Sequence, residues 1–186
     1  MSKLETNTID TVSGTTNLII GSTNTSTITM PNGKLTGHNY PAFEAYLSAD
    51  QTSISDNVTT KAAINTEVFD TDNCYDNSTN YRFTPTVAGK YFVYASLHGA
   101  GTAGNGSVNQ IRVYLYKNGS VYRRSSTNFM TANIANSSTK VSAIIEFNGS
   151  SDYVEAYAQI NVNSSTAYLL ATPSQMTNFG AYRIGA

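Results

Sequence analysis

The sequence predicts an all-β protein, built as a sandwich or jelly roll. Its 13 Tyr, 7 Phe and 13 Gly, with β-branched residues spread along the chain, favour strands and turns over helices. Alternating apolar segments separated by turn residues recur about every 8 to 15 residues, as they do in β-sandwiches. No segment shows the helical period.

The hairpin around Asn118-Gly119 is the plainest of these features. The segment 111–116 alternates between the two faces of a strand, and an Asn-Gly pair suits a tight hairpin because both central residues take positive φ. We expect the return strand to begin at Val121. The apolar residues that share one face of the first strand are Ile111, Val113 and Leu115.

Segments 141–147 and 153–160 predict two more strands, joined by a turn over 148–152. The Asn, Gly, Ser and Asp residues of this turn are typical of tight loops. The apolar residues on one face of the second segment are Val154, Ala156, Ala158 and Ile160.

The chain divides into two predicted parts, residues 1–40 and residues 41–186. The second has the size of one ordinary domain. In the first, isolated apolar residues stand among Thr, Asn, Ser and Gly, which predicts about three or four very short strands. Three chains wound around one axis could cover each other's strand edges. A disordered tail is the alternative interpretation.

Three segments follow one another in the second part, at 42–47, 64–70 and 81–95. Their order resembles the globular head of complement component 1q and its tumour-necrosis-factor relatives. The landmarks that continue this order are 117–119, the hairpin 142–154 and the closing strand 178–184. The resemblance implies a jelly roll of about ten strands that works as a trimer. No collagen-like Gly-X-Y repeat precedes the head, so a complement or adipokine role is not supported.

Large aromatic residues on both faces of one strand predict a second covered surface. Residues Tyr91, Val93, Ala95 and Leu97 would fill the sandwich, which leaves Phe92 and Tyr94 on the opposite face. Each such ring buries roughly 150–250 Å², and contact between subunits is the simplest cover. Loops or solvent over the rings are the alternative. By resemblance to the family, the candidate trimer interface is Phe92, Tyr94, Phe179 and Tyr182.

The charge of the chain excludes one class of partner. Charged residues make up 12% of the sequence, the formal net charge is −1 and the pI is about 6.1. Without a basic field to hold a phosphate backbone, we expect no nucleic-acid partner. No apolar run approaches the length of a membrane span and the start lacks the apolar core of a signal peptide, so we expect no membrane insertion and synthesis in a host cytoplasm.

The surface and the first residues indicate a bacteriophage virion. A low-charge surface rich in hydroxyl and amide groups is typical of an exposed fibre, and release by lysis reconciles it with folding in the cytoplasm. The opening residues 3–11 resemble the N-terminal parts of phage tail-fibre proteins. We therefore expect a non-enzymatic homotrimeric tail or neck fibre on the virion surface, attached to other virion proteins through residues 1–40. A capsid decoration protein without a receptor role and a polysaccharide-degrading spike enzyme are the alternatives.

Loops at the free end of the head are the expected contact with a host-surface glycan or receptor, because binding loops on a rigid scaffold are the usual arrangement. They span residues 99–109 and 128–139. Tyr rings beside amides and hydroxyls suit sugar recognition, since rings stack on sugar faces and amides read hydroxyl groups. The candidate contact residues are Gly101, Asn105, Asn109, Asn128 and Asn133.

Three carboxylates, Asp70, Asp72 and Asp76, have spacings close to those of a calcium loop. Tyr75 stands where an EF-hand needs Gly, and Tyr81 stands where it needs Glu. The favoured interpretation is a solvated turn without a cofactor, and a weak calcium site is the alternative.

No motif predicts catalysis. The pattern Gly99-x-Gly101-x-x-Gly104 matches a dinucleotide fingerprint, but a strand follows it where a helix would be needed. His38 and His98 stand in no nucleophile or ligand motif, and Asp152 and Glu155 are three apart on a strand and face opposite ways. The lone Cys74 reads as a buried hydrophobic residue. We therefore predict that the protein is not an enzyme.

Overall fold

The computed structural model describes residues 40–103, 107–129, 134–172 and 174–185. The chain divides into two compact units, residues 1–38 and 39–186. The first unit lies outside the described residues, and so do the short strands predicted there. In the second unit the described residues form strands and turns without any helix, and none of them forms a helix long and apolar enough to cross a membrane.

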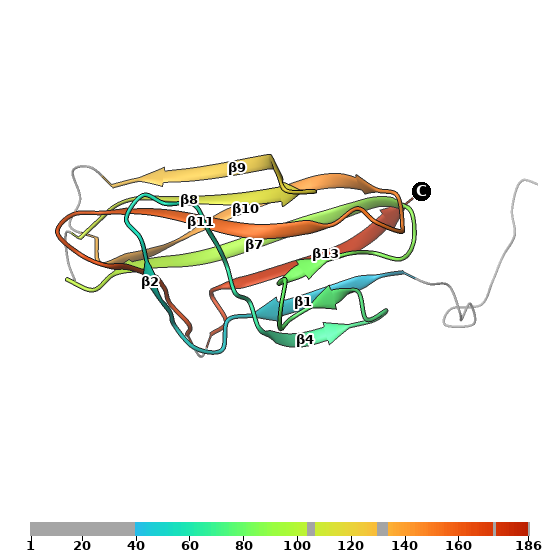
Figure 1. The fold of residues 1–186 in the computed structure, drawn as a ribbon, viewed down its shortest axis with the longest axis horizontal. Coiled ribbons are helices and arrows are strands. Elements are labelled where there is room, and N and C mark those ends of the chain that lie inside the picture. The colour runs from blue at the N-terminus through green and yellow to red at the C-terminus, as the bar shows by residue number, and fades with distance from the viewer. Residues whose placement is uncertain (1–39, 104–106, 130–133, 173, 186) are drawn as a thin grey trace, which may run out of the picture. The chain divides into compact units, whose positions relative to one another are not determined.

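The strands form two antiparallel sheets packed face to face (Figure 1). Sheet A has the order β2-β12-β7-β13-β1-β4, with β10 paired to β7, and sheet B has the order β5-β6-β11-β8-β9, with β3 paired to β11. This arrangement confirms the predicted all-β sandwich. The strands are β1 (Ala42–Tyr46), β2 (Gln51–Ile54), β3 (Thr60–Lys61), β4 (Thr66–Asp70), β5 (Tyr75–Asp76), β6 (Arg82–Phe83), β7 (Gly89–Gly101), β8 (Val108–Lys117), β9 (Ser120–Asn128), β10 (Asn136–Phe147), β11 (Val154–Val162), β12 (Ala167–Leu169) and β13 (Asn178–Gly185).

The hairpin predicted at Asn118-Gly119 is confirmed. The two residues have φ of 50° and 78° and join β8 to β9, which is the conformation that an Asn-Gly pair adopts most readily. The apolar faces predicted for the strands that became β8 and β11 lie in the core, where no member of either face exceeds 1% exposure.

Two predictions about connections are wrong. The segments 141–147 and 153–160 form strands, but β10 pairs with β7 in sheet A and β11 pairs with β8 in sheet B. The turn between them therefore crosses from one sheet to the other. The predicted loop at 99–109 also begins too early, because β7 continues to Gly101 and β8 starts at Val108.

An aromatic cluster holds the two sheets together. Phe43 of β1 stacks on Tyr75 and on Phe83, with ring centroids 4.4 and 4.7 Å apart, and meets Phe179 edge-on at 5.0 Å. The cluster continues through Tyr91, which lies edge-on to Phe83. Stacked and edge-on pairs stabilise beyond their buried area, so these rings fix how strands of sheet A sit over strands of sheet B.

We predict that Phe43→Ala lowers the free energy of unfolding by about 3–5 kcal/mol, because it removes the central ring of this cluster and leaves a cavity. Urea denaturation followed by tyrosine fluorescence measures the change. Val58→Ala, at an exposed position, is the control and should cost less than about 0.5 kcal/mol. Equal losses for the two variants would show that the cluster does not support the fold.

Candidate functional site

The outer face of sheet A, turned away from the core, carries a patch of apolar side chains that we call the sheet A surface. Phe92 of β7 has Ile144 of β10 as its cross-strand partner on one side and Tyr182 of β13 on the other. The rings of Phe92 and Tyr182 lie 5.5 Å apart. Ile144 is 56% exposed and Tyr182 is 49% exposed, which is unusual for neighbouring large apolar residues in a monomer.

Tyr94 continues the sheet A surface along β7 and is held in place. Its ring lies 6.1 Å from that of Phe92 and its hydroxyl donates to Glu44 Oε2 at 3.0 Å. Burial, followed by the nearby Glu44 carboxylate, raises the pKa of Tyr94 above its ordinary value. A Cβ on Gly180, the partner of Tyr94 on β13, would lie 2.4 Å from the Tyr94 hydroxyl oxygen. The ring therefore lies flat on the backbone of β13, where only Gly leaves room for it.

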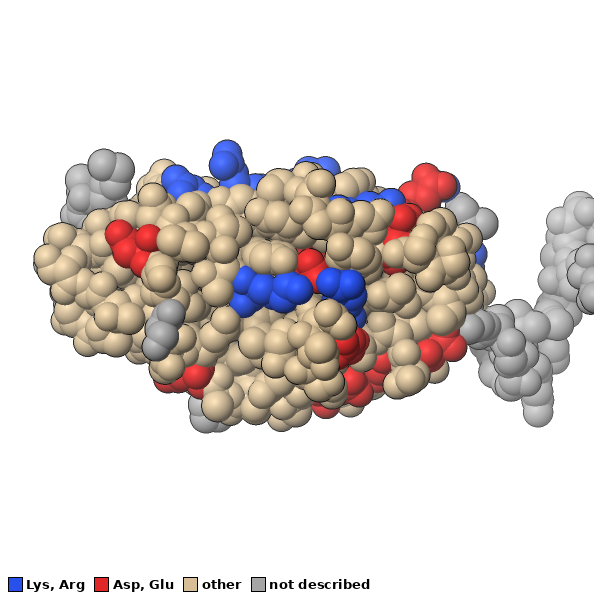
Figure 2. All heavy atoms as spheres, viewed as in Figure 1, with Lys and Arg blue, Asp and Glu red and all other residues tan. Residues whose placement is uncertain are grey.

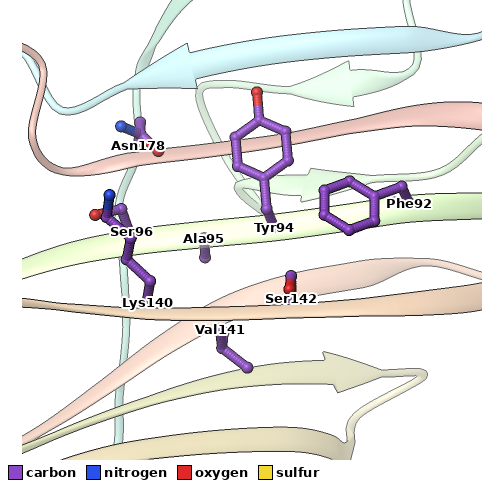
Figure 3. A pocket seen from close by; sticks show the side chains of 8 residues that line it. All are labelled: Phe92, Tyr94, Ala95, Ser96, Lys140, Val141, Ser142 and Asn178. Carbon is purple, nitrogen blue, oxygen red and sulfur yellow. The ribbon is translucent and has the colours of Figure 1, made fainter.

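A shallow hollow of about 360 Å³ lies beside these rings. Figure 3 shows Phe92 and Tyr94 next to each other on β7, with Ser142 and Lys140 on the adjacent strand β10. Polar residues line the part of the hollow that lies further along β7. The sheet A surface is thus apolar around Phe92 and becomes polar toward Ser96.

Three of the four predicted interface residues lie together on the sheet A surface, and Phe179 does not. Phe179 is fully buried between the sheets, because it is an odd number of residues from Tyr182 on the same strand and so faces the opposite way. The prediction that Phe179 lies on the outer face is therefore wrong. Sequence reasoning also missed Ile144. The pair Ile144-Ile145 breaks the alternation of β10, and this break was the available signal.

Exposed apolar residues also follow the edge where β9 and β10 meet. Tyr122 and Val121 of β9 are 45% and 55% exposed, and the Tyr122 hydroxyl donates to the backbone carbonyl of Ile144 at 3.1 Å. Among the described residues, β10 pairs with β7 alone. No described strand pairs with its other edge, where side chains bond two of the carbonyls: Tyr122 donates to Ile144, and Lys117 Nζ donates to Glu146 at 2.7 Å.

The outer face of sheet B is aromatic too, but its rings are paired with charged groups. Glu155 is 2% exposed, and its Oε1 accepts from Lys61 Nζ at 2.7 Å and from Arg82 Nη2 at 2.8 Å. Arg82 lies 3.9 Å from the ring centre of Tyr153, and the Tyr157 hydroxyl donates to Glu155 Oε2 at 3.2 Å. Burial, followed by Glu155, raises the pKa of Tyr157 to about 12. Tyr153 and Tyr157 therefore have charged partners within the same chain.

Charged side chains are few on the face of the molecule that Figure 2 draws. Figure 2 shows one face as mostly uncharged, with Lys and Arg side chains and a carboxylate gathered near its middle.

Comparison with known proteins identifies the architecture. No protein-family model matches the sequence, and no curated protein matches it. Among solved structures, murine APRIL at pH 5.0 matches with a TM-score of 0.55 and 10% identity, covering 78% of this chain and 100% of that one. The Eiger TNF from S. frugiperda matches with a TM-score of 0.50 and 12% identity, covering 78% of this chain and 92% of that one. The fold is a tumour-necrosis-factor-like jelly roll. The globular domain of zebrafish complement 1qA shows a lower likeness, with a TM-score of 0.49, 15% identity, and coverage of 78% of this chain and 98% of that one.

The predicted ligand-contact residues of the jelly roll are only partly brought together. Asn109 and Asn128 lie beside one polar groove at the ends of β8 and β9. Gly101 is buried at the end of β7, packed against Ser107, and is therefore not a contact residue as predicted. Asn105 and Asn133 lie outside the described residues.

The three carboxylates considered for calcium do not converge on one point of the jelly roll. Asp70 accepts from the backbone of Tyr75 at 2.8 Å, and Asp72 contacts Thr86 and Cys74. Asp76 accepts from the backbone amides of residues 78, 79 and 80 at 2.9 to 3.1 Å. In the described part of the chain, no group of three His, Cys, Asp or Glu residues is arranged to hold a metal ion.

The remaining candidates for chemistry are held apart. His98 is buried, with Nε2 2.9 Å from Asn136 Oδ1, and His38 lies outside the described residues. Asp152 binds Lys117 at 3.0 Å, whereas Glu155 binds Lys61 and Arg82. Burial raises the pKa of the Cys74 thiol to about 11, so this thiol is protonated at neutral pH and is a poor nucleophile.

We predict that the turn at Asp76 makes stability depend on acid. The backbone amide of Thr79, helped by those of Ser78 and Asn80, holds the pKa of Asp76 well below its ordinary value and outweighs the effect of burial. A lowered pKa in the folded state stabilises above the unfolded value of about 3.9, and this contribution is lost as the pH falls. Asp76→Asn should therefore destabilise at pH 7, and its difference from the wild type should shrink below about pH 4.

Urea unfolding of both proteins from pH 7 to pH 3 measures this difference. Glu67→Gln, which removes an exposed carboxylate of β4, is the control. A deficit of Asp76→Asn that stays constant over the whole pH range would contradict the assignment.

Proposed function

We propose that this chain is a non-enzymatic head that assembles as a homotrimer through the sheet A surface and serves as an outward fibre head on a phage virion, where it binds a host-surface glycan. The observation that carries the proposal is the apolar row Ile144, Phe92 and Tyr182, in which the two outer residues are exposed on one protomer and Phe92 is half-buried between them. The rings of sheet B offer a comparison, because hydrogen bonds and cations satisfy them within the chain.

Two different apolar areas support contact with further copies of the same chain. One is the face around Phe92 and Tyr182, and the other is the β9–β10 edge around Val121 and Tyr122, and Ile144 lies where the two areas adjoin. When the edge of one copy packs on the face of the next, the interface is heterologous, and repeating it closes a ring when the rotation permits. The exposed parts of these rings and of the aliphatic side chains beside them contribute apolar area toward the approximately 800 Å² per partner that a stable interface needs.

The proposed number of subunits, three, is inferred from the fold. The resemblance to complement component 1q and tumour-necrosis-factor heads, and the likeness of the architecture to APRIL and Eiger TNF, support a closed ring of three copies. The low-charge, hydroxyl-rich sequence and the opening residues 3–11 support a place on a virion, with residues 1–40 attaching to other virion proteins. A capsid decoration that meets no receptor would share the same trimer, and a spike enzyme would release reducing sugar from host polysaccharide.

We predict that Ile144→Lys turns the trimer into monomers. It places a charge on a side chain that is 56% exposed in one protomer, so the protomer fold is kept while the interface receives an unpaired buried charge. Light scattering after size-exclusion chromatography measures the mass. The wild type should have about three times the mass of the variant.

Val58→Lys is the matched control, since it adds the same charge at another exposed apolar position that lies outside both areas. It should leave the trimer intact. A wild-type protein that runs as a monomer would overturn the proposal, and so would an Ile144→Lys protein that stays trimeric.

We predict that antibodies against a tag at Ala186 label intact virions at a fibre position. Electron microscopy of gold-labelled particles locates the tag, and particles from an untagged phage are the control. Label confined to disrupted particles, or none at all, would contradict the virion role while leaving the trimer untouched.

A further inference from the structure

A polar groove lies on sheet B where β8 begins and where β9 and β11 end. Its volume is about 590 Å³, the size of an ordinary ligand site. The residues that line it are Asn109, Gln110, Arg112, Asn128, Asn161 and Asn163. No carboxylate and no aliphatic side chain is among them, so the groove offers amide donors and acceptors with one positive charge.

Part of this hydrogen-bonding capacity is unused within the chain. Gln110 donates to Asn128 across the β8–β9 pair, and Asn161 donates to Asp56 Oδ1 at 3.4 Å. Within the described part of the chain, the side-chain amides of Asn109 and Asn163 make no hydrogen bond. Each amide has both donors and an acceptor, a set that matches the hydroxyl groups of a sugar.

Arg112 supplies the charge and also has capacity left. Its Nη1 donates to Gln159 Oε1 at 2.6 Å and to Asn57 Oδ1 at 3.4 Å. The ion pairs among the described residues do not include it. Since guanidinium nitrogens form a fork of five N–H donors, the remaining ones can bind a carboxylate from outside.

Tyrosine rings continue the same face of sheet B beyond Arg112. Along β8 the outward positions run from Gln110 through Arg112 to Tyr114 and Tyr116, and Tyr157 of β11 is the partner of Tyr114. The rings of Tyr116 and Tyr157 lie 4.3 Å apart. From the groove to this ring pair is about 13 Å, four residues of strand. A chain ligand can therefore contact amides at one end and aromatic faces at the other.

The groove lies at the end of the sandwich that points away from Ala42 and Gly185 (Figure 1). The proposed trimer covers sheet B only along the edge around Val121 and Tyr122 of β9. In a fibre held through residues 1–40, this is the end of the head that reaches a host surface.

We propose that this groove binds an acidic saccharide chain, with its sugar hydroxyls on the side-chain amides of Asn109 and Asn163 and its carboxylate on Arg112. This inference rests on the proposed function, since the role as a virion head indicates where the ligand comes from. The residues of the groove indicate the chemistry of the ligand. The carboxylate of Asp56, which accepts from the groove residue Asn161, also accepts from the backbone amide of Val162 at 2.8 Å. The saccharide extends along β8 toward Tyr116 and Tyr157.

Calorimetric titration of the full-length protein tests the proposal. The probes are hexamers of galacturonic acid, of sialic acid and of hyaluronate, and the carboxyl-reduced form of each hexamer is its matched neutral ligand. At least one acidic hexamer should bind. Arg112→Gln should weaken that binding about tenfold or more, as expected for the loss of hydrogen bonds to a charged group, and should leave the carboxyl-reduced form unchanged.

Three further variants separate the contributions of Arg112 and of the two amides to binding. Arg112→Lys, which keeps the charge without the fork, should bind with intermediate affinity. The double variant Asn109→Ala, Asn163→Ala should weaken both forms of the hexamer. Arg123→Gln, which removes the same charge from an exposed position of β9, should change nothing.

Failure of all three acidic hexamers to bind a trimeric protein would overturn the inference and leave the trimer standing. Equal affinities of the wild type and Arg112→Gln would overturn it as well. A monomeric protein that binds an acidic hexamer through Arg112 would instead overturn the proposed assembly and support the site.

Discussion

Strand β7 contributes side chains to two surfaces at once, the core of the sandwich and the outer face of sheet A. The arrangement of the other strands depends on this double role. It pairs with β10 along one side and with β13 and β12 along the other. One face of β7 contributes Tyr91, Val93 and their neighbours to the core, while the other presents Phe92 and Tyr94. Since successive side chains of a strand point to opposite faces, the sequence of β7 fixes both surfaces together. A change of register by one residue would exchange them.

The two sheets manage their aromatic residues differently. On sheet B, the Tyr157 hydroxyl donates to the buried carboxylate of Glu155, and Arg82 lies over the ring of Tyr153. On sheet A, Phe92 and Ile144 have no polar atoms in their side chains and cannot be satisfied in this way. The outer face of sheet B therefore has polar partners for its rings within the chain, whereas the outer face of sheet A presents apolar side chains that have none.

Much of this architecture was readable from the sequence because strand alternation has a strict period. The apolar faces of β8 and β11 and the Asn118-Gly119 turn follow directly from residue type and spacing. The period also decides Phe179 and Tyr182, which are three residues apart and so must face opposite ways. A resemblance that assigned both to one interface conflicted with that rule, and the rule was right.

Long-range pairing was harder to predict, because local signals do not specify it. The turn at 148–152 looks like a hairpin turn, yet it joins strands of different sheets. For the same reason the sequence predicted only some of the residues that line the polar groove of sheet B. Asn109 and Asn128 were predicted contact residues at the ends of the two predicted loops. Arg112 and Asn161 lie further inside their strands, and they reach the groove only because β8 pairs with both β9 and β11.

The open edge of β10 has a cost for a newly made chain. A strand edge that pairs with no other strand and lies beside exposed apolar side chains is a template for any strand that meets it. Before its own copies arrive, a folded protomer is therefore exposed to aggregation, and the danger grows with the delay between folding and encounter. Synthesis of many copies at one place in the cell would shorten that delay, so the apolar residues of the proposed interface favour rapid production of the chain.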